Sequence, residues 1–209
     1  MRTRTGWSSL APLLADKKLY LVTPLRSDLA EFLGAAIRGG VDVVQIRERG
    51  VPDGRLLEAL EKARGFAGAL GVPFGVNDRP DLAVLCDADF VHLGQDDIPV
   101  DAARSFGLPV GLSTHAPREI VEAASDYIGV GPVYATPTKE GRAPVGLELV
   151  RYAAEHARVP WFAIGGIDAT NVEEVVAPGA KRIAVVRAIG AADDPERAAR
   201  ELRVALPRS

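Results

Sequence analysis

Short runs of β-branched and apolar residues recur along the chain, and each is followed by a segment whose apolar residues return with a period near 3.6. The runs predict strands, and the segments between them predict helices. The expected strands are 18–23, 41–47, 73–77, 89–93, 109–114, 127–131, 161–165 and 182–186. The expected helices lie near 28–38, 54–70, 79–85, 100–106, 117–124, 147–157, 169–177 and 193–204.

Eight consecutive strand–helix pairs, with no linker between them, favour one α/β domain folded as a (β/α)8 TIM barrel. A doubly wound open sheet is the alternative, but eight units within 209 residues favour closure. We assign residues 18–209 to the barrel and residues 1–17 to an N-terminal leader or an extra helical turn. Active sites of such barrels lie at the carboxyl ends of the strands, so these ends direct the search for functional residues.

The composition narrows the classes of function. The net charge of −3, from 25 Lys+Arg and 28 Asp+Glu, provides no long-range attraction to nucleic acid or to acidic membranes. The single cysteine excludes an intrachain disulfide and a cysteine-based metal cluster, and no stretch resembles a transmembrane helix. We therefore expect a cytoplasmic protein that binds small molecules, and its oligomeric state stays open.

The second expected strand ends in QIRER, residues 45–49. Side chains alternate along a strand, so Gln45, Arg47 and Arg49 share one face, and Ile46 and Glu48 share the other. Parallel strands are normally apolar on both faces, so we expect this polar row to have a specific structural or functional role. It is either a layer of salt bridges that closes the barrel or a cradle for an anion, because guanidinium groups match phosphate geometry.

Two carboxylates follow neighbouring strands. Asp78 comes after Asn77 at the end of the third expected strand, and Asp97 comes after the fourth. Each could simply cap a turn or a helix. Together they form a pair of oxygen ligands at one rim, which suits Mg²⁺ bound by carboxylates and substrate phosphates. His92, within the fourth strand, is expected to be packed or hydrogen-bonded in the core.

The later strands also end in polar residues or glycines. Ser113 ends the fifth strand, where its hydroxyl could reach the barrel mouth. Gly165 ends the seventh strand, Gly166 follows it, and Arg187 follows the eighth strand. The loops after these two strands are the usual phosphate site of TIM barrels.

The segment YATPTKEG, residues 134–141, follows the sixth expected strand. In an extended chain Thr136 and Thr138 turn their hydroxyls the same way, whereas Lys139 points elsewhere. Pro137 would stiffen the segment. One short loop could therefore touch two anions, with its hydroxyls on one and its ammonium on the other.

Seven motifs occur in order at these strand ends: QIRER (45–49), VNDRPDLA (76–83), HLGQDD (92–97), GLSTH (111–115), GPVYATPTK (131–139), AIGGI (163–167) and VVRAI (185–189). With them the chain resembles the thiamine-phosphate synthase family over nearly its whole length. The resemblance implies a transferase that joins hydroxymethylpyrimidine diphosphate to a thiazole or carboxythiazole phosphate. The products would be thiamine phosphate and pyrophosphate, and Mg²⁺ would be required.

The resemblance also implies a role for each matching residue. The pyrimidine diphosphate would be held by Gln45, Ile46, Arg47, Glu48, Arg49, Asn77, Ser113 and Lys139. The thiazole phosphate would be held by Thr136, Pro137, Thr138, Gly166, Val186 and Arg187. Asp78 and Asp97 would ligate Mg²⁺, and the catalytic residues would be Arg47, Arg49, Ser113 and Lys139. Two positions depart from the family pattern, since Arg49 replaces a usual lysine and Arg187 a small hydroxyl residue.

Three other functions compete with this interpretation. A thiazole tautomerase, a sister barrel, is expected to lack the Thr-x-Thr-Lys segment that this chain has. A non-catalytic barrel that binds thiamine phosphate would not need Asp78, Asp97 and Lys139. A sugar-phosphate epimerase or lyase would need an acid and a base facing each other at the rim, and the sequence shows no such pair clearly.

Overall fold

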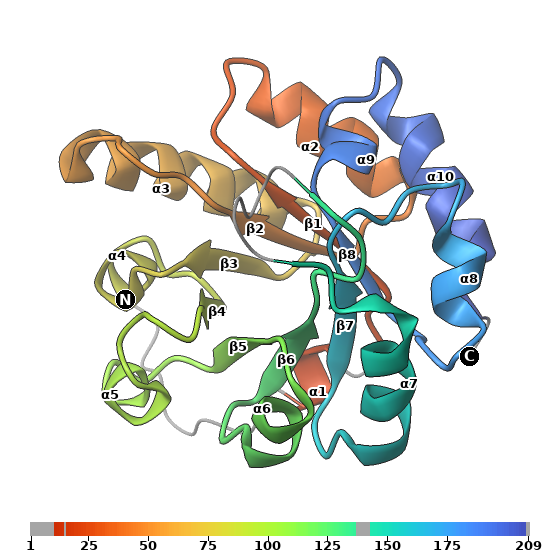
Figure 1. The fold of residues 1–209 in the computed structure, drawn as a ribbon. Helices are drawn as coiled ribbons and strands as arrows, with labels where there is room; N and C mark the ends of the chain where they lie inside the picture. Colours follow the sequence, from red (N-terminus) through yellow and green to blue (C-terminus); the bar gives the residue numbers. More distant parts are fainter. Residues whose placement is uncertain (1–10, 15, 137–142, 208–209) are drawn as a thin grey trace.

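The computed structural model describes residues 11–14, 16–136 and 143–207, and its eight strands form a closed barrel. Every strand runs parallel to its neighbours, and the eighth pairs with the first. Figure 1 shows the strands at the centre with the helices arranged around them. The predicted TIM barrel is therefore confirmed, and the open-sheet alternative is wrong.

The strands and helices lie close to their predicted positions. The strands are β1 (Leu19–Thr23), β2 (Val43–Ile46), β3 (Phe74–Asn77), β4 (Phe90–Leu93), β5 (Val110–Thr114), β6 (Tyr127–Val130), β7 (Trp161–Ile164) and β8 (Ile183–Val185). The helices are α1 (Ala11–Leu14), α2 (Leu29–Gly39), α3 (Asp53–Ala69), α4 (Pro80–Leu85), α5 (Val100–Arg104), α6 (Pro117–Glu122), α7 (Gly146–His156), α8 (Val172–Val176), α9 (Arg187–Gly190) and α10 (Pro195–Ala205).

Alternation along the strands divides the core into two layers. In β2, Val44 and Ile46 pack in the layer between the strands and the helices, whereas Val43 belongs to the cluster inside the barrel. Gln45 also points inward, where it is only 2% exposed. Leu14 of α1 is fully buried and packs with the inner cluster. The short helix before β1 therefore contributes to the core of the barrel.

Four aromatic rings fill much of the barrel interior. They belong to Tyr20, Phe90, Tyr127 and Phe162, and the centroids of five of their six pairs lie 5.2–6.2 Å apart. Two glycines make room for them. A Cβ atom at Gly75 would lie 2.1 Å from the Phe90 ring, and one at Gly111 would lie 2.1 Å from the Tyr127 ring. The packing therefore requires glycine at both positions.

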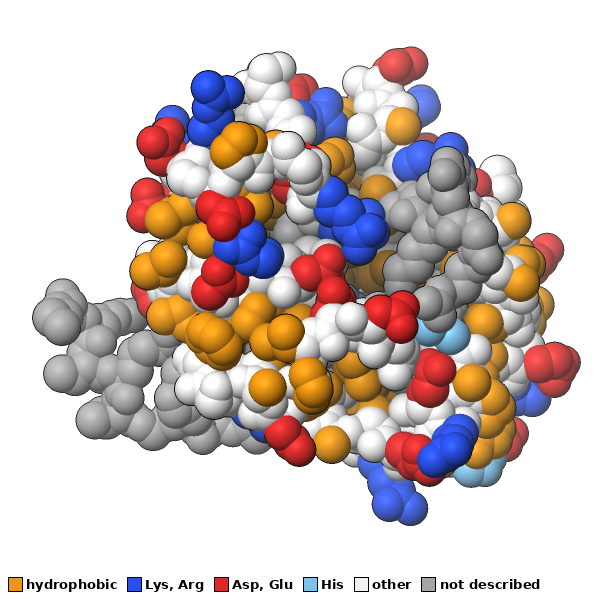
Figure 2. Space-filling model, turned by 60° about the vertical axis from the view of Figure 1, so that its left-hand side comes forward, with side chains coloured by type: hydrophobic (Ala, Val, Ile, Leu, Met, Phe, Trp, Pro, Cys, Tyr) orange, Lys and Arg blue, Asp and Glu red, His pale blue; other side chains and the backbone are white. Residues whose placement is uncertain are grey.

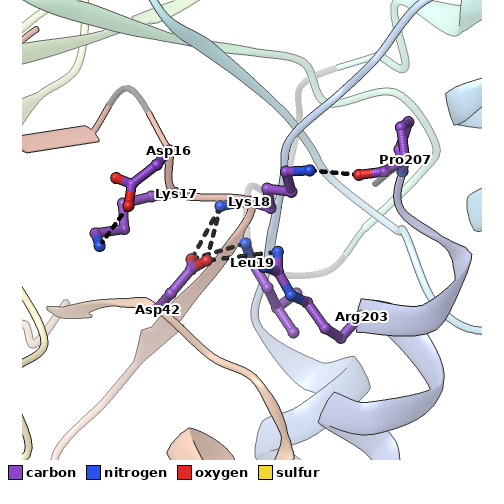
Figure 3. Close-up of polar contacts among 7 residues, drawn as sticks. All are labelled: Asp16, Lys17, Lys18, Leu19, Asp42, Arg203 and Pro207. Carbon is purple, nitrogen blue, oxygen red and sulfur yellow. Dashed lines mark hydrogen bonds and ion pairs between the residues drawn. The ribbon is translucent and has the colours of Figure 1, made fainter. Parts of the chain in front are cut away.

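A carboxylate fastens the amino end of β1, at the opposite end of the barrel from the mouth. Asp42 accepts hydrogen bonds from the backbone N–H groups of Lys18 and Leu19 at 2.9–3.0 Å, as Figure 3 shows. Arg203 of α10 lies 3.5 Å from the same carboxylate, and the Lys18 ammonium donates to the Pro207 carbonyl. These contacts join the first strand to the last helix and help to close the ring.

The same arrangement recurs at the starts of β3 and β5. Asp89 accepts from the Phe74 N–H and Asp126 from the Val110 N–H, both at 2.9 Å. Each carboxylate again has an arginine from a neighbouring helix, Arg64 at 3.3 Å and Arg104 at 3.2 Å respectively. A backbone N–H at the start of a strand otherwise lacks a partner, so the aspartates satisfy these donors. We call Asp42, Asp89 and Asp126 the clamp aspartates.

The side of the molecule covered by α3, α4 and α5 carries mixed charges. Figure 2 shows Lys and Arg side chains interspersed there with Asp and Glu and with apolar groups. The exposed apolar residues include Leu70, Leu85 and Phe106. The described residues on this face therefore form no extended basic surface of the kind that nucleic acid binding uses. Among the described residues, no helix is both long and apolar enough to cross a membrane.

We predict that Gly111→Ala lowers the free energy of unfolding by ~2 kcal/mol, because the new methyl group would overlap the buried Tyr127 ring. The measurement is equilibrium urea unfolding. Gly65→Ala, in α3 with nothing within 4 Å of the added Cβ, is the matched control and should gain up to ~1 kcal/mol. Equal stability of the two variants would contradict the packing role of Gly111.

Candidate active site

A cavity of about 240 Å³ opens at the carboxyl ends of the strands. Side chains or backbone from all eight strands line it, and so do residues from the loops after β6, β7 and β8. The predicted site residues along its wall are Gln45, Arg47, Asn77, Ser113, Thr136, Gly166, Val186 and Arg187. The structure thus brings the residues expected for both substrates to one cavity.

A chain of hydrogen bonds crosses the floor of this cavity. Gln45 Nε2 donates to Asn77 Oδ1 at 2.7 Å, and the Tyr20 hydroxyl donates to Gln45 Oε1. The hydroxyls of Tyr20 and Tyr127 lie 3.1 Å apart. His92 then links Tyr127 at 2.9 Å from Nδ1 to the Ser113 hydroxyl at 3.0 Å from Nε2. Six side chains are joined, in the order Asn77, Gln45, Tyr20, Tyr127, His92 and Ser113.

The chain of hydrogen bonds has a direction. Because the Tyr20 proton goes to Gln45, the Tyr20 oxygen accepts from Tyr127. Tyr127 has then used its proton, so His92 donates to it from Nδ1, and in that tautomer Nε2 accepts from the Ser113 hydroxyl. Burial raises the pKa of both tyrosines, so their hydroxyls stay protonated. The Ser113 hydroxyl thus stands at the cavity as the last member of this chain of hydrogen bonds.

Arg47 extends the inward face of β2 to the wall of the cavity. Its side chain is half-buried, and desolvation lowers its pKa, with the nearby Arg49 charge acting in the same direction. Asp78 and Asp97 favour its charged form, but within the described residues no carboxylate lies within ion-pair distance of Arg47. A guanidinium in this position can bind an anion without first breaking an ion pair.

Asp78 and Asp97 come together at the rim. Burial, and then the hydrogen bond and charge of the Asp97 carboxyl beside it, raise the pKa of Asp78 to about 6, although Arg49 acts in the opposite direction. Asp78 has a φ of 62°, a left-handed conformation that aspartate tolerates better than most residues. Asp97 also accepts a hydrogen bond from the Gly94 N–H at 2.6 Å, so it caps its own loop as well.

The rest of the QIRER motif divides between rim and scaffold. Arg49 is 70% exposed and lies 3.4 Å from Asp78. The Glu48 carboxylate accepts from the backbone N–H groups of Leu25 and Arg49, so it fixes the loops after β1 and β2. The Ile46 side chain is buried against the helices, which leaves only its backbone to face a ligand.

The loops after β6 and β7 are joined above the barrel. The Val133 N–H donates to the Ile164 carbonyl and the Tyr134 N–H to the Gly165 carbonyl, both at 2.9 Å. Gly165 and Gly166 have φ values of 106° and 68°, and a Cβ atom at Gly166 would lie 2.7 Å from that of Tyr134. These glycines let the backbone of the β7 loop approach the cavity closely.

The comparisons with known proteins agree with this arrangement. Residues 19–189 match a family described as thiamine monophosphate synthase. A thiamine-phosphate synthase of Arthrobacter sp. is 48% identical, with 93% of this chain and 96% of the relative covered. A thiamine phosphate pyrophosphorylase structure from Pyrococcus furiosus has a TM-score of 0.82 and 34% identity, covering 90% of this chain and 94% of that one.

The chain belongs to the thiamine monophosphate synthase family. This confirms the family, the transferase class and the thiamine-phosphate synthase function predicted from the sequence. Some relatives are longer. A thiamine-phosphate synthase of Gloeobacter violaceus is 51% identical over 93% of this chain, but the chain spans only 59% of that protein.

Some of the predicted site residues of this family member lie outside the described residues. They are Pro137, Thr138 and Lys139, and their roles stay predictions. Conversely, sequence reasoning missed Tyr20 and Tyr127 as parts of the site. The alternation of side chains along β1 and β6 could have indicated that both tyrosines point inward. Their hydrogen bonds could not have been predicted in this way, because they depend on how the strands face each other across the barrel.

We predict that Asp78→Asn stabilises the protein near pH 7 in EDTA. The pKa of Asp78 is about 6 in the folded protein, whereas the ordinary value for an unfolded chain is 3.8. Because the folded state binds this proton more tightly, the protonated carboxyl contributes favourably to the free energy of unfolding. That contribution is present below pH ~4 and is lost as the pH rises through 6. The variant should gain ~1 kcal/mol at pH 7, allowing for partial solvent screening, and much less at pH 4. Urea unfolding at both pH values measures this.

Asp193→Asn, in an exposed position before α10, is the control and should stay within ~0.5 kcal/mol of the wild type at both pH values. An Asp78→Asn gain of the same size at pH 4 and pH 7 would show that the carboxylate pair does not cause it.

Proposed function

We propose that the barrel mouth joins 4-amino-5-hydroxymethyl-2-methylpyrimidine diphosphate to a thiazole or carboxythiazole phosphate, which gives thiamine phosphate and pyrophosphate. One observation carries the residue assignment. Residues expected for the diphosphate substrate, Gln45, Arg47, Asn77 and Ser113, share a single cavity with Thr136, Gly166, Val186 and Arg187, which are expected for the other substrate. A condensation needs both substrates in one place.

We assign the diphosphate to the β2 side of the mouth. Arg47 faces the cavity, and Arg49 stands at the rim beside Asp78. Lys139, outside the described residues, is proposed as a third cation. Arginine instead of lysine at position 49 keeps the charge but adds a planar fork of donors, so it would bind the outer phosphate through two hydrogen bonds.

We assign a magnesium ion to Asp78 and Asp97. Burial, and then the Asp97 carboxyl beside it, raise the pKa of Asp78, and a divalent cation would relieve the repulsion between the two carboxylates. Carboxylate oxygens are the ligands that Mg²⁺ prefers, and substrate phosphates can complete its coordination. In the described part of the chain, no three His, Cys, Asp or Glu side chains gather as a self-sufficient metal site. When bound, the ion would neutralise charge on the diphosphate.

The reaction we propose forms a bond between the thiazole nitrogen and the methylene carbon of the pyrimidine. The bond between that carbon and the diphosphate oxygen breaks, and its electron pair leaves with pyrophosphate. Arg47 and Arg49 would stabilise the charge that develops on the leaving group. Gln45, Asn77 and Ser113 would hold the pyrimidine ring in line with the attacking nitrogen. No protein nucleophile takes part.

The thiazole phosphate is assigned to the opposite side, at the loops after β6, β7 and β8. The close backbone turn at Gly165 and Gly166 and the hydroxyl of Thr136 lie at this part of the cavity. Backbone N–H groups in such turns bind phosphate oxygens in many barrels. Arg187 adds a positive charge where a small hydroxyl residue is common in the family.

We also propose that the enzyme works in the cytoplasm on free small molecules. Both substrates carry phosphate groups, which do not cross membranes unaided, and the near-neutral charge of −3 provides no attraction to nucleic acid. Cell fractionation with an antibody to the chain tests the compartment.

We predict that the purified protein, given both phosphorylated precursors and Mg²⁺, releases thiamine phosphate and pyrophosphate in equal amounts. Liquid chromatography and a pyrophosphate assay measure the two products. EDTA should abolish the activity, and added Mg²⁺ should restore it. Isomerisation of the thiazole compound without any thiamine phosphate would instead support a tautomerase and contradict the proposal.

We predict that Lys139→Ala slows turnover by about 100-fold or more and leaves the binding of thiazole phosphate within a factor of ~3, because its charge acts on the departing pyrophosphate. Steady-state kinetics and equilibrium binding separate the two effects. Lys181→Ala, which changes an exposed lysine before β8, is the control. Loss of thiazole phosphate binding alone would show that Lys139 holds the other anion.

A further inference from the structure

Three glycines lie on the inward face of the barrel strands, and one of them is not required by packing. A Cβ atom at Gly75 or Gly111 would lie 2.1 Å from a buried aromatic ring. At Gly129 the nearest atoms to an added Cβ are His92 Cε1 at 3.5 Å and, at 3.8 Å, His92 Nε2 and Ile164 Cγ2, which are ordinary contacts. Gly129 also lacks the positive φ that demands glycine elsewhere. The fold would accept alanine there.

Gly129 lies at the cavity. In β6 it follows Tyr127 by two residues, so both face inward, and its own backbone lines the cavity. The register places it between Ser113 of β5 and Phe162 of β7. The neighbouring inward positions of these strands carry side chains, so the missing side chain leaves an open place on the floor beside His92 and Ile164.

The surroundings of this open place suit a flat ring with several nitrogen atoms. Tyr127, Phe162 and Ile164 supply apolar walls, and the three described atoms nearest to an added Cβ belong to His92 and Ile164. The Ser113 hydroxyl lies on the neighbouring strand β5, and the amides of Gln45 and Asn77 stand across the barrel in β2 and β3. A diphosphate would be poorly placed here, because Arg47 and Arg49 belong to the loop after β2 and Arg187 to the start of α9.

We infer that substrate binding, and not the packing of the fold, requires glycine at position 129. It determines specificity by leaving room for the pyrimidine ring of the diphosphate substrate. The inference rests on the proposed function and assigns the ring to a place within that site. A pyrimidine with its amino group has three nitrogens that need partners, which the floor provides. The thiazole nitrogen is the nucleophile and must stay unpaired, so the thiazole fits this floor less well.

The test compares Gly129→Ala with Gly111→Ala and Gly65→Ala by thermal unfolding, binding and kinetics. Gly129→Ala should keep its Tm within ~2 °C of the wild type, whereas Gly111→Ala should unfold at a clearly lower temperature. The KM of Gly129→Ala for the pyrimidine diphosphate should rise roughly tenfold to a hundredfold, the usual effect of one methyl group in a fitted pocket. Its KM for thiazole phosphate and its Kd for inorganic pyrophosphate should stay within about twofold.

The outcomes separate this inference from the proposed function. A wild-type protein that makes no thiamine phosphate would contradict the function itself. With an active wild type, an unchanged KM for the pyrimidine diphosphate in Gly129→Ala would overturn the inference. A Tm loss as large as that of Gly111→Ala, or failure to fold, would also overturn it, since packing would then explain the glycine. A rise in KM for thiazole phosphate alone would assign the floor to the wrong ring.

Discussion

The filling of the barrel interior is the constraint on which the rest of this structure depends. Eight short parallel strands enclose a space that must be packed without water, and four aromatic rings do most of this. Two of them carry hydroxyls that cannot remain unpaired when buried. Tyr20 and Tyr127 therefore pair with each other and extend to Gln45 on one side and His92 on the other. Packing and polar satisfaction together produce the floor of the cavity at the barrel mouth.

One consequence is that the stability of the barrel and the shape of its site share residues. The Tyr127 ring packs in the inner cluster of the barrel. Its hydroxyl oxygen accepts from His92 Nδ1, which sets the tautomer of His92, and His92 in turn orients the Ser113 hydroxyl. At the rim, in contrast to the floor, residues of the cavity mouth lower the stability of the fold. Asp78 and Asp97 stand close together at an electrostatic cost that the folded chain tolerates because other interactions hold their loops in place. The site is thus rigid at its floor and electrostatically strained at its rim.

The sequence was sufficient for the fold because alternation and helical periodicity are local properties. The inward direction of Gln45 follows from its place in β2 alone, and Asp78 and Asp97 are neighbours because β3 and β4 are adjacent in a barrel. What depended on distant contacts could not be predicted. The pairing of Tyr20 with Tyr127 joins strands that are not neighbours, and Gly111 and Gly129 look alike in sequence but meet different surroundings. Nor does the QIRER motif reveal that Glu48 holds loops together.

The clamp aspartates have a consequence for how this barrel could be changed. Asp42, Asp89 and Asp126 stand at the amino ends of the strand pairs β1–β2, β3–β4 and β5–β6, and each uses a helix arginine as its counterion. The arrangement therefore repeats every two strand–helix units from β1 to β6, whereas the corresponding position before β8 is Arg182. These contacts lie at the opposite end of the barrel from the cavity. A protein engineer could exchange mouth loops, or recombine two-unit segments from related barrels, while keeping these fasteners intact.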